Sequence, residues 1–287
     1  MASNFSLAST LDVMMRMALE RAREEEQMPE IKKYAQGWPS WVELATTDEK
    51  GALKFYGSMF GWRNKPQPMG PGASYHMQLV KGLEAAAIVE LSLDDKKRRI
   101  PAHWRTYFTV LKVDETARRI AALGGKLVAP PFDVMEAGRM AVGQDPQGAM
   151  FNLWQKKNHI GSRIRNETGA VNWIELLTTD SKKAVAFYSG LLGVESHKMA
   201  GPGDYTLLSV DGEDVAGVMQ ISEEMGPIPP SWNVYFGVGV VGAATKKAQS
   251  LGGKVLMDAR TEPGVGRFAT LQDPQGAVFS LFKPSKD

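Results

Sequence analysis

The sequence predicts an α+β fold of two tandem domains, each made of two strand–helix–strand–strand–strand units that form a curved mixed sheet with the helices outside. The main observation is that Trp41-Val-Glu-Leu-Ala-Thr-Thr-Asp48 recurs as Trp173-Ile-Glu-Leu-Leu-Thr-Thr-Asp180. Shorter motifs recur in the same order: Phe-Tyr at 55 and 187, Gly-Pro-Gly at 70 and 201, Gly-Gly-Lys at 124 and 252, and Asp-Pro-Gln-Gly-Ala at 145 and 273. A repeat of about 130 residues is too long for a solenoid unit, so it indicates two copies of a whole domain.

The first half of domain 1 shows how the elements follow one another. Side chains alternate along a strand, so Trp41 and Glu43 point the same way from the opening strand. Asp48 is a good N-cap for the helix that follows, and Gly61 is a good residue to end it. Asp114 is predicted to cap a second helix, which ends at the Gly-Gly pair at 124.

The other strands are predicted from short apolar runs that are bounded by turn residues. In domain 1 these runs are residues 75–80, 85–91, 105–110, 128, 139–142 and 149–154. In domain 2 the strands are residues 173–177, 206–210, 215–221, 233–238, 268–271 and 278–282. The pattern places domain 1 at residues 38–157, a polar linker at 158–168 and domain 2 at 169–287.

Residues 1–37 lie outside the repeat. A helix is predicted to begin at Thr10, because apolar residues then recur at helical spacing before the charged run at Glu24. We expect this N-terminal helix to pack on the body of the protein or on a second subunit, so a homo-oligomer is possible. A membrane-surface helix is less favoured, because the polar face is not mainly basic.

Composition excludes several classes of partner. The formal net charge is +2, from 34 basic and 32 acidic residues, so nothing favours nucleic acid or an anionic membrane. There is no cysteine, which excludes thiolate chemistry and thiolate metal sites. Neither a secretory signal nor an apolar run of about 20 residues is present. We therefore expect a soluble, cytoplasmic protein.

Four units that open as a strand, an Asp and a helix with Phe-Tyr, and that close on Asp-Pro-x-Gly, resemble the vicinal oxygen chelate superfamily. This group contains glyoxalase I, the bleomycin and fosfomycin resistance proteins and the extradiol dioxygenases. The resemblance covers residues 38–284 and is strongest to the tandem glyoxalase-like proteins of bacteria. It implies the fold, with a cup inside each curved sheet, but it does not specify a reaction.

The catalytic members of the superfamily hold a divalent metal at four strand positions of the cup. The resemblance places these positions at Trp41, Glu90, Arg105 and Asn152 in domain 1, and at Trp173, Gln220, Asn233 and Ser280 in domain 2. An indole cannot coordinate a metal, and a guanidinium keeps its proton. Too few donors remain for zinc, nickel or iron, so we expect no metal and no cofactor. A rearranged site is the alternative, with His76 or His103 joined by Glu43 and Glu90.

Without a metal, each cup would present aromatic and hydrogen-bonding side chains to a small-molecule ligand. In domain 1 these are Trp41, Glu43, Glu90, Arg105, Tyr107, Asn152 and Trp154. In domain 2 they are Trp173, Glu175, Gln220, Asn233, Tyr235, Ser280 and Phe282. Arg105 is expected to pair with Glu90. Either this pair only closes an empty cup, or Arg105 contacts an anionic or carbonyl-bearing ligand. The second cup suits a neutral planar ligand, unless Trp173 simply packs in a filled core.

Three functions follow from these expectations. The first is a small-molecule binding protein, in the manner of the bleomycin-resistance members, that takes an aromatic or amphipathic metabolite without a metal. The second is a lyase, isomerase or hydroxylase-like enzyme of the superfamily, with Glu43 or Glu175 as general base or with the rearranged metal site. The third is an interaction protein that uses the N-terminal helix.

Overall fold

The computed structural model describes residues 30–70, 72–199 and 204–285. Both sheets belong to one contact unit, which begins at Lys32. The predicted N-terminal helix, and with it any role in assembly, lies outside the described residues. No helix in the described part of the chain is long and apolar enough to cross a membrane.

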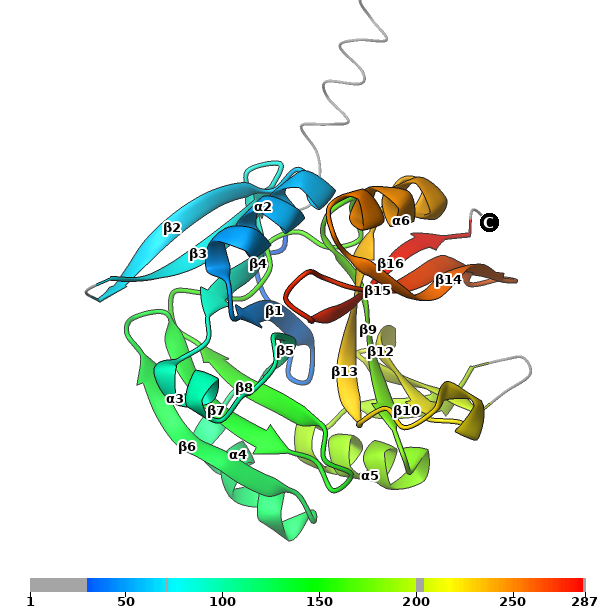
Figure 1. Cartoon of the computed structure of the whole chain (residues 1–287). Helices are drawn as coiled ribbons and strands as arrows, with labels where there is room; N and C mark the ends of the chain where they lie inside the picture. The colour runs from blue at the N-terminus through cyan, green and yellow to red at the C-terminus, as the bar shows by residue number, and fades with distance from the viewer. Residues whose placement is uncertain (1–29, 71, 200–203, 286–287) are drawn as a thin grey trace, which may run out of the picture. The chain divides into compact units, whose positions relative to one another are not determined.

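The first sheet has eight strands in the order β2-β3-β4-β1-β5-β8-β7-β6. Its strands are β1 Pro39–Thr46, β2 Arg63–Gly70, β3 Ala73–Val80, β4 Leu83–Glu90, β5 His103–Thr109, β6 Lys126–Val134, β7 Gly138–Gln144 and β8 Met150–Lys156. Its helices are α2 Glu49–Phe60, α3 Leu93–Lys97 and α4 Val113–Ala122. The strands run from blue to green in Figure 1, and α4 packs on β6, β7 and β8.

The second sheet repeats this topology in the order β10-β11-β12-β9-β13-β16-β15-β14. Its strands are β9 Val171–Thr178, β10 Glu195–Lys198, β11 Tyr205–Val210, β12 Glu213–Gln220, β13 Ser231–Gly237, β14 Lys254–Glu262, β15 Gly266–Gln272 and β16 Val278–Pro284. Its helices are α5 Ser181–Leu192, α6 Val241–Ser250 and the short 3₁₀ helix η1 Glu223–Met225. The α+β fold of two tandem domains is therefore confirmed.

The helix caps follow the predicted chemistry in the opening unit of each domain. Asp48 accepts the Gly51 N–H at 3.0 Å, and Asp180 accepts the Lys183 N–H at 3.0 Å. Gly61 ends α2 in the left-handed conformation at φ 69°, which glycine adopts without steric cost. The predicted cap at Asp114 is wrong, because α4 begins at Val113 and the Asp114 carboxylate instead pairs with Arg139.

The recurring Phe-Tyr and Asp-Pro-Gln-Gly motifs contact each other between the two halves of the chain. Tyr56 on α2 donates a hydrogen bond to Asp273 Oδ2 at 3.0 Å, and Tyr188 on α5 donates one to Asp145 Oδ2 at 3.2 Å. The other oxygen of Asp145 accepts backbone N–H groups of its own turn. Each helix is thus tied to the last turn of the other domain.

Candidate functional site

The central strand of each sheet sets the position of the cup residues. Every residue of β1 is buried, and its register with β5 places Glu43 opposite Arg105. The same register between β9 and β13 places Glu175 opposite Asn233. Directly opposed residues of an antiparallel pair lie on the same face at about 5 Å between Cβ atoms, so each glutamate meets its partner inside the cup.

Glu43 and Arg105 form the ion pair of the first cup. Arg105 Nη1 lies 3.0 Å from Glu43 Oε1, and the side chains are 30% and 8% exposed. Arg105 Nε also donates to His103 Nε2 at 3.3 Å. Burial lowers the pKa of His103, which favours the neutral imidazole that this hydrogen bond requires.

Two tyrosines complete a cluster around Glu43. Tyr75 accepts a hydrogen bond from Trp41 Nε1 at 2.9 Å. Burial, and then the charge of Glu43, raise the pKa of Tyr75 and of Tyr107 well above the usual value. Both phenols therefore keep their protons and act as hydrogen-bond donors toward the carboxylate.

The expected pairing of Arg105 with Glu90 is wrong. Glu90 is exposed and lies 2.5 Å from Lys96 Nζ. The register explains this, because Glu43 lies opposite Ala87 on β4, so Ala87 and Val89 face the cup and Glu90 faces away from it.

Gln220 has the same displaced position in the second domain. Its Oε1 accepts the Ser181 N–H at 2.8 Å at the start of α5, and its Nε2 donates to Thr179 O at 2.6 Å. Gly217 is the residue of β12 that lies opposite Glu175. Glu90 and Gln220 are therefore corrected from cup residues to residues at the strand ends.

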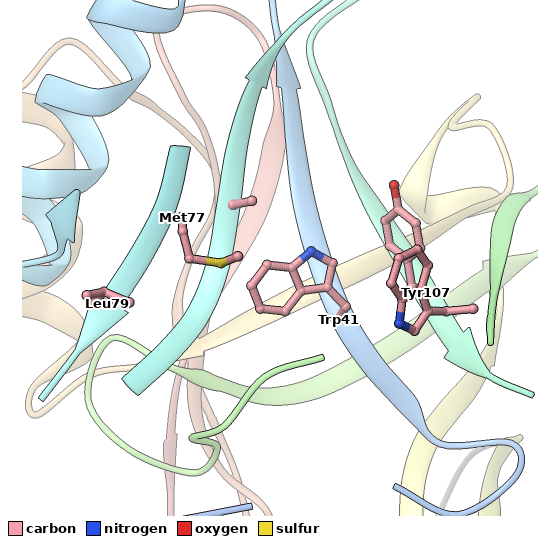
Figure 2. Packing of buried hydrophobic residues seen from close by; sticks show 6 residues of the cluster. Trp41, Met77, Leu79 and Tyr107 are labelled. Carbon is pink, nitrogen blue, oxygen red and sulfur yellow. The ribbon is translucent and has the colours of Figure 1, made fainter. Parts of the chain in front are cut away.

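The first cup is filled by its own side chains. Trp41, Met77, Leu79, Ala87, Tyr107 and Trp154 form one buried cluster, and Figure 2 shows the Trp41 indole between Met77 and Tyr107. The His159 ring packs edge-on against Trp41 at 4.6 Å, and Trp154 Nε1 donates to His159 O at 2.9 Å. Asn152 is buried and donates to Thr106 O at 3.2 Å. The linker at His159 therefore covers this cup.

The second cup keeps the same cluster around Glu175. Tyr235 donates to Glu175 Oε1 at 2.7 Å, and Tyr205 donates to Oε2 at 2.9 Å while accepting from Trp173 Nε1 at 2.9 Å. Burial raises the pKa of Glu175, against the two tyrosine hydrogen bonds and the charge of Arg260, which act to lower it. A glycine at 217 is needed here, since a Cβ would lie 1.9 Å from the Tyr205 hydroxyl.

The walls of the second cup remain partly exposed. Trp173, Tyr205, Phe268 and Phe282 are all of intermediate exposure, whereas Trp41 and Trp154 of the first cup are buried. Tyr235 packs edge-on against Phe282, with ring centroids 6.3 Å apart. The second cup therefore has more partly exposed ring surface than the first, in which Tyr75 is of intermediate exposure and Trp41, Tyr107 and Trp154 are buried.

Asn233 has an unsatisfied acceptor on the same face of the sheet as these rings. Its Nδ2 donates to Ser280 Oγ at 2.9 Å, and Ser280 also bonds Thr270 Oγ1 at 2.9 Å. Asn233 Oδ1 is buried and has no hydrogen-bond partner among the described residues. A buried carbonyl without a donor costs about 1–3 kcal/mol, so this atom is a natural point for a ligand to bind.

Tyr75 and Tyr205 were missed by the sequence analysis, although a signal for them exists. Each follows the recurring Gly-Pro-Gly motif within a few residues and lies near the start of a strand, β3 or β11. Arg260 was also missed, because β14 was not predicted as a strand, and Phe268 lies on the predicted strand 268–271 but was not included among the cup residues.

The residues at the superfamily's metal positions do not fit a metal ion. The Trp41 indole is a hydrogen-bond donor to Tyr75, and the guanidinium of Arg105 already pairs with the cup's carboxylate. Asn233 and Ser280 bond each other. Within residues 30–70, 72–199 and 204–285, no group of three or more His, Asp or Glu side chains is arranged to hold a metal.

The histidines considered for a rearranged metal site bond elsewhere. His76 Nε2 lies 2.9 Å from Glu49, and His103 Nδ1 lies 2.8 Å from Pro101 O. The positive charge of Arg105 next to His103 opposes a cation there.

Comparison with protein families agrees with the fold and the repeat. The model of the Glyoxalase/Bleomycin resistance protein/Dioxygenase superfamily matches residues 38–153 and 170–281. The chain therefore belongs to this superfamily, as the motifs predicted, in its tandem two-domain form.

Two groups of relatives cover almost the whole chain. A Mycobacterium tuberculosis protein named "Putative glyoxylase CFP32" is 40% identical over 261 residues, which cover 90% of this chain and 99% of the relative. The Anthracycline biosynthesis protein DauV of Streptomyces sp. strain C5 is 32% identical, over 88% of this chain and 94% of the relative.

Solved structures share the fold at low sequence identity. The 2,3-dioxygenase LapB from Pseudomonas sp. KL28 superposes with a TM-score of 0.61 at 15% identity, covering 88% of this chain and 94% of that one. The Mn(II)-bound glyoxalase from Novosphingobium aromaticivorans gives a TM-score of 0.59 at 15% identity, covering 86% and 83%. At such identities the likeness concerns the fold alone.

Proposed function

We propose that the cup of domain 2 binds a small aromatic or amphipathic molecule by ring packing and hydrogen bonding, without the superfamily's metal. The observation that carries this proposal is Asn233 Oδ1, which has no partner among the described residues and lies on the same sheet face as the partly exposed rings of Trp173 and Phe282. A ligand with a planar apolar part would cover the rings, and an N–H or O–H group would satisfy the carbonyl.

Domain 1 has a structural role in this proposal. Its cup residues Trp41, Tyr107 and Trp154 are buried in one cluster, and its glutamate is neutralised by Arg105. A ligand would have to displace His159 and open a packed core, which costs more than binding to preformed accessible rings. We therefore assign ligand binding to one cup rather than two.

Tryptophan fluorescence tests the proposal, because a ligand that packs on Trp173 changes its emission. The full chain is titrated with a library of planar aromatic compounds. An anthracycline is included, because two relatives carry that word in their names. Trp173→Phe is the test variant, and Trp41→Phe, at the matching position of the filled cup, is the control.

The expected result is a saturable change that Trp173→Phe abolishes and Trp41→Phe preserves. The opposite pattern would place the ligand in domain 1 and contradict the assignment. A flat response to the whole library, together with no heat of binding by calorimetry, would leave both cups as structural cores.

A second candidate is an enzyme that uses Glu175 as a general acid or base. The supporting observation is the raised pKa of this buried carboxyl, which brings it nearer to the working range of proton transfer at neutral pH. The relative named as a glyoxylase makes lyase substrates the first to try. This candidate would be supported by turnover that is lost in Glu175→Gln and retained in Glu43→Gln. The turnover should also be unchanged by a chelator. Turnover that follows added metal would contradict the proposed absence of a metal.

A further inference from the structure

We propose that the ligand of domain 2 carries a cationic amine, and that this amine takes the place that the Arg105 guanidinium occupies in domain 1. The inference rests on the proposed function and adds the charge of the ligand. It comes from comparing two copies of one cup within a single chain.

The first argument is the register. Glu43 and Arg105 are opposed residues of β1 and β5, and Glu175 and Asn233 are the matching opposed residues of β9 and β13. In domain 1 a cation lies 3.0 Å from the glutamate. In domain 2 the matching position is occupied by Asn233, which is shorter than arginine and neutral. Among the described residues, the Glu175 carboxyl therefore lacks the ion pair that Glu43 has in domain 1.

The second argument is the convergence of acceptors. Glu175 presents a carboxyl and Asn233 presents a buried Oδ1 without a partner among the described residues, and the two residues face each other. An ammonium group has three N–H donors and no acceptor, so it matches a site made of a carboxyl and a carbonyl. An anion at the same place would meet two acceptors, because no cation of the described residues forms an ion pair with Glu175 and the charge of Arg260 acts on this carboxyl without one.

The third argument is the aromatic lining. A cation is stabilised over the face of an aromatic ring within about 6 Å, and aromatic cages that recognise organic ammonium groups use this attraction. The chain already places a cation on this lining, since the Arg260 guanidinium lies 4.9 Å from the centroid of Phe268. Trp173 and Phe282 remain partly exposed for the planar part of a ligand.

The protonation state of Glu175 should make the binding of a cationic ligand depend on pH. The groups that act on this carboxyl are Tyr205 from β11, Tyr235 from β13 and Arg260 from β14, in addition to burial, which raises its pKa. A bound ammonium favours the ionised carboxyl, so binding releases a proton whenever Glu175 is protonated in the free protein. Affinity for a cation should therefore rise as the pH rises toward and past the pKa of Glu175.

Calorimetry of the full chain with three probes of one shape tests the inference. The probes are tryptamine, which is cationic, tryptophol, which is its neutral alcohol, and indole acetate, which is anionic. We expect tryptamine to bind about tenfold more tightly than tryptophol, with indole acetate weakest, and the preference to grow as the pH rises. Glu175→Gln should remove the preference, so that tryptamine and tryptophol bind with the same affinity within about twofold.

Asn233→Arg supplies the matched variant, because it rebuilds in domain 2 the pair that domain 1 already contains. It should keep the thermal midpoint of the parent, as Arg105 is accommodated at the same register, and should lose tryptamine binding. Arg105→Asn is the control, and it should not change tryptamine affinity because the first cup is filled. Tryptophol binding as tightly as tryptamine would overturn the charge inference and leave the proposed function standing. No binding of any probe or library compound would overturn the proposed function itself.

Discussion

Removing the Tyr188 hydroxyl tests whether the two repeated motifs hold the domains together. This hydroxyl donates to Asp145 Oδ2 at 3.2 Å and accepts from Trp232 Nε1 at 2.9 Å, and all three groups are buried. Tyr188→Phe keeps the ring and its packing, so it deletes the two hydrogen bonds with little change of shape. The matching variant in the other half is Tyr56→Phe, whose hydroxyl bonds Asp273 and Trp104.

The magnitude follows from the two partners that each variant leaves behind. A hydrogen bond to a carboxylate contributes about 1.5–3 kcal/mol, and a buried indole N–H without an acceptor costs about 1–3 kcal/mol. Asp145 keeps three backbone donors on its other oxygen, which reduces the loss. We expect each variant to lower the free energy of unfolding by about 3 kcal/mol, or about 6–12 °C in the midpoint. The double variant should lose about 6 kcal/mol, since the two sites share no partner.

Urea unfolding followed by far-UV circular dichroism measures these losses. Tyr34→Phe is the control, because its buried hydroxyl donates to the neutral Ser162 carbonyl at 2.7 Å and should contribute about 1 kcal/mol. A change below about 0.5 kcal/mol in both Tyr188→Phe and Tyr56→Phe would refute the argument that these contacts tie the halves together.

Two further predictions concern the glutamates of the cups. Arg105→Ala leaves Glu43 buried without its cation, so it should lower the free energy of unfolding in urea by about 3 kcal/mol. Adding Glu43→Gln should recover part of that loss. A double variant no more stable than Arg105→Ala would contradict the ion-pair argument. For Glu175 the folded-state pKa lies above the unfolded value, so the protonated carboxyl stabilises the fold at low pH and this contribution is lost as the pH rises through the folded pKa. The thermal midpoint of Glu175→Gln relative to the parent should therefore increase as the pH rises above the ordinary glutamate pKa, and a difference that stays constant with pH would contradict a raised pKa for this carboxyl.

The interior of the fold was predictable because its strands are apolar and its motifs recur, and the edges were not. The edge strands β2, β10 and β14 were not predicted, and β6 was recognised only at Val128. The residues of these strands are mostly exposed, and β6 contains Pro130-Pro131. Edge strands gain their hydrogen bonds from one neighbour and bury little side-chain area, so a pattern of buried residues cannot reveal them.

The candidate site was predictable only where the alternation of side chains between the two faces of a strand could be followed from residue to residue. Trp41 and Glu43 share a face because they are two residues apart on one strand, and the structure places them so. Glu90 lies at the far end of β4, where an error of one residue moves a side chain to the opposite face. Tyr75 and the linker residue His159 depend on contacts between distant segments, which no local pattern specifies.

The comparison of the two cups separates what the shared cluster does from what each domain adds. Both contain Trp, Glu and two Tyr in the same arrangement, so this cluster by itself cannot distinguish a filled cup from a binding cup. Two differences act independently: Arg105 supplies a cation to Glu43, and His159 covers Trp41. Replacing Arg105 alone would leave the buried Glu43 carboxylate unpaired without giving a ligand access to the cup. Removing His159 alone would give access to a cup whose carboxylate is already neutralised by Arg105. On the proposed function, a domain of this kind should bind an organic cation only when both features are absent, and Asn233 and the partly exposed Trp173 meet that condition in domain 2.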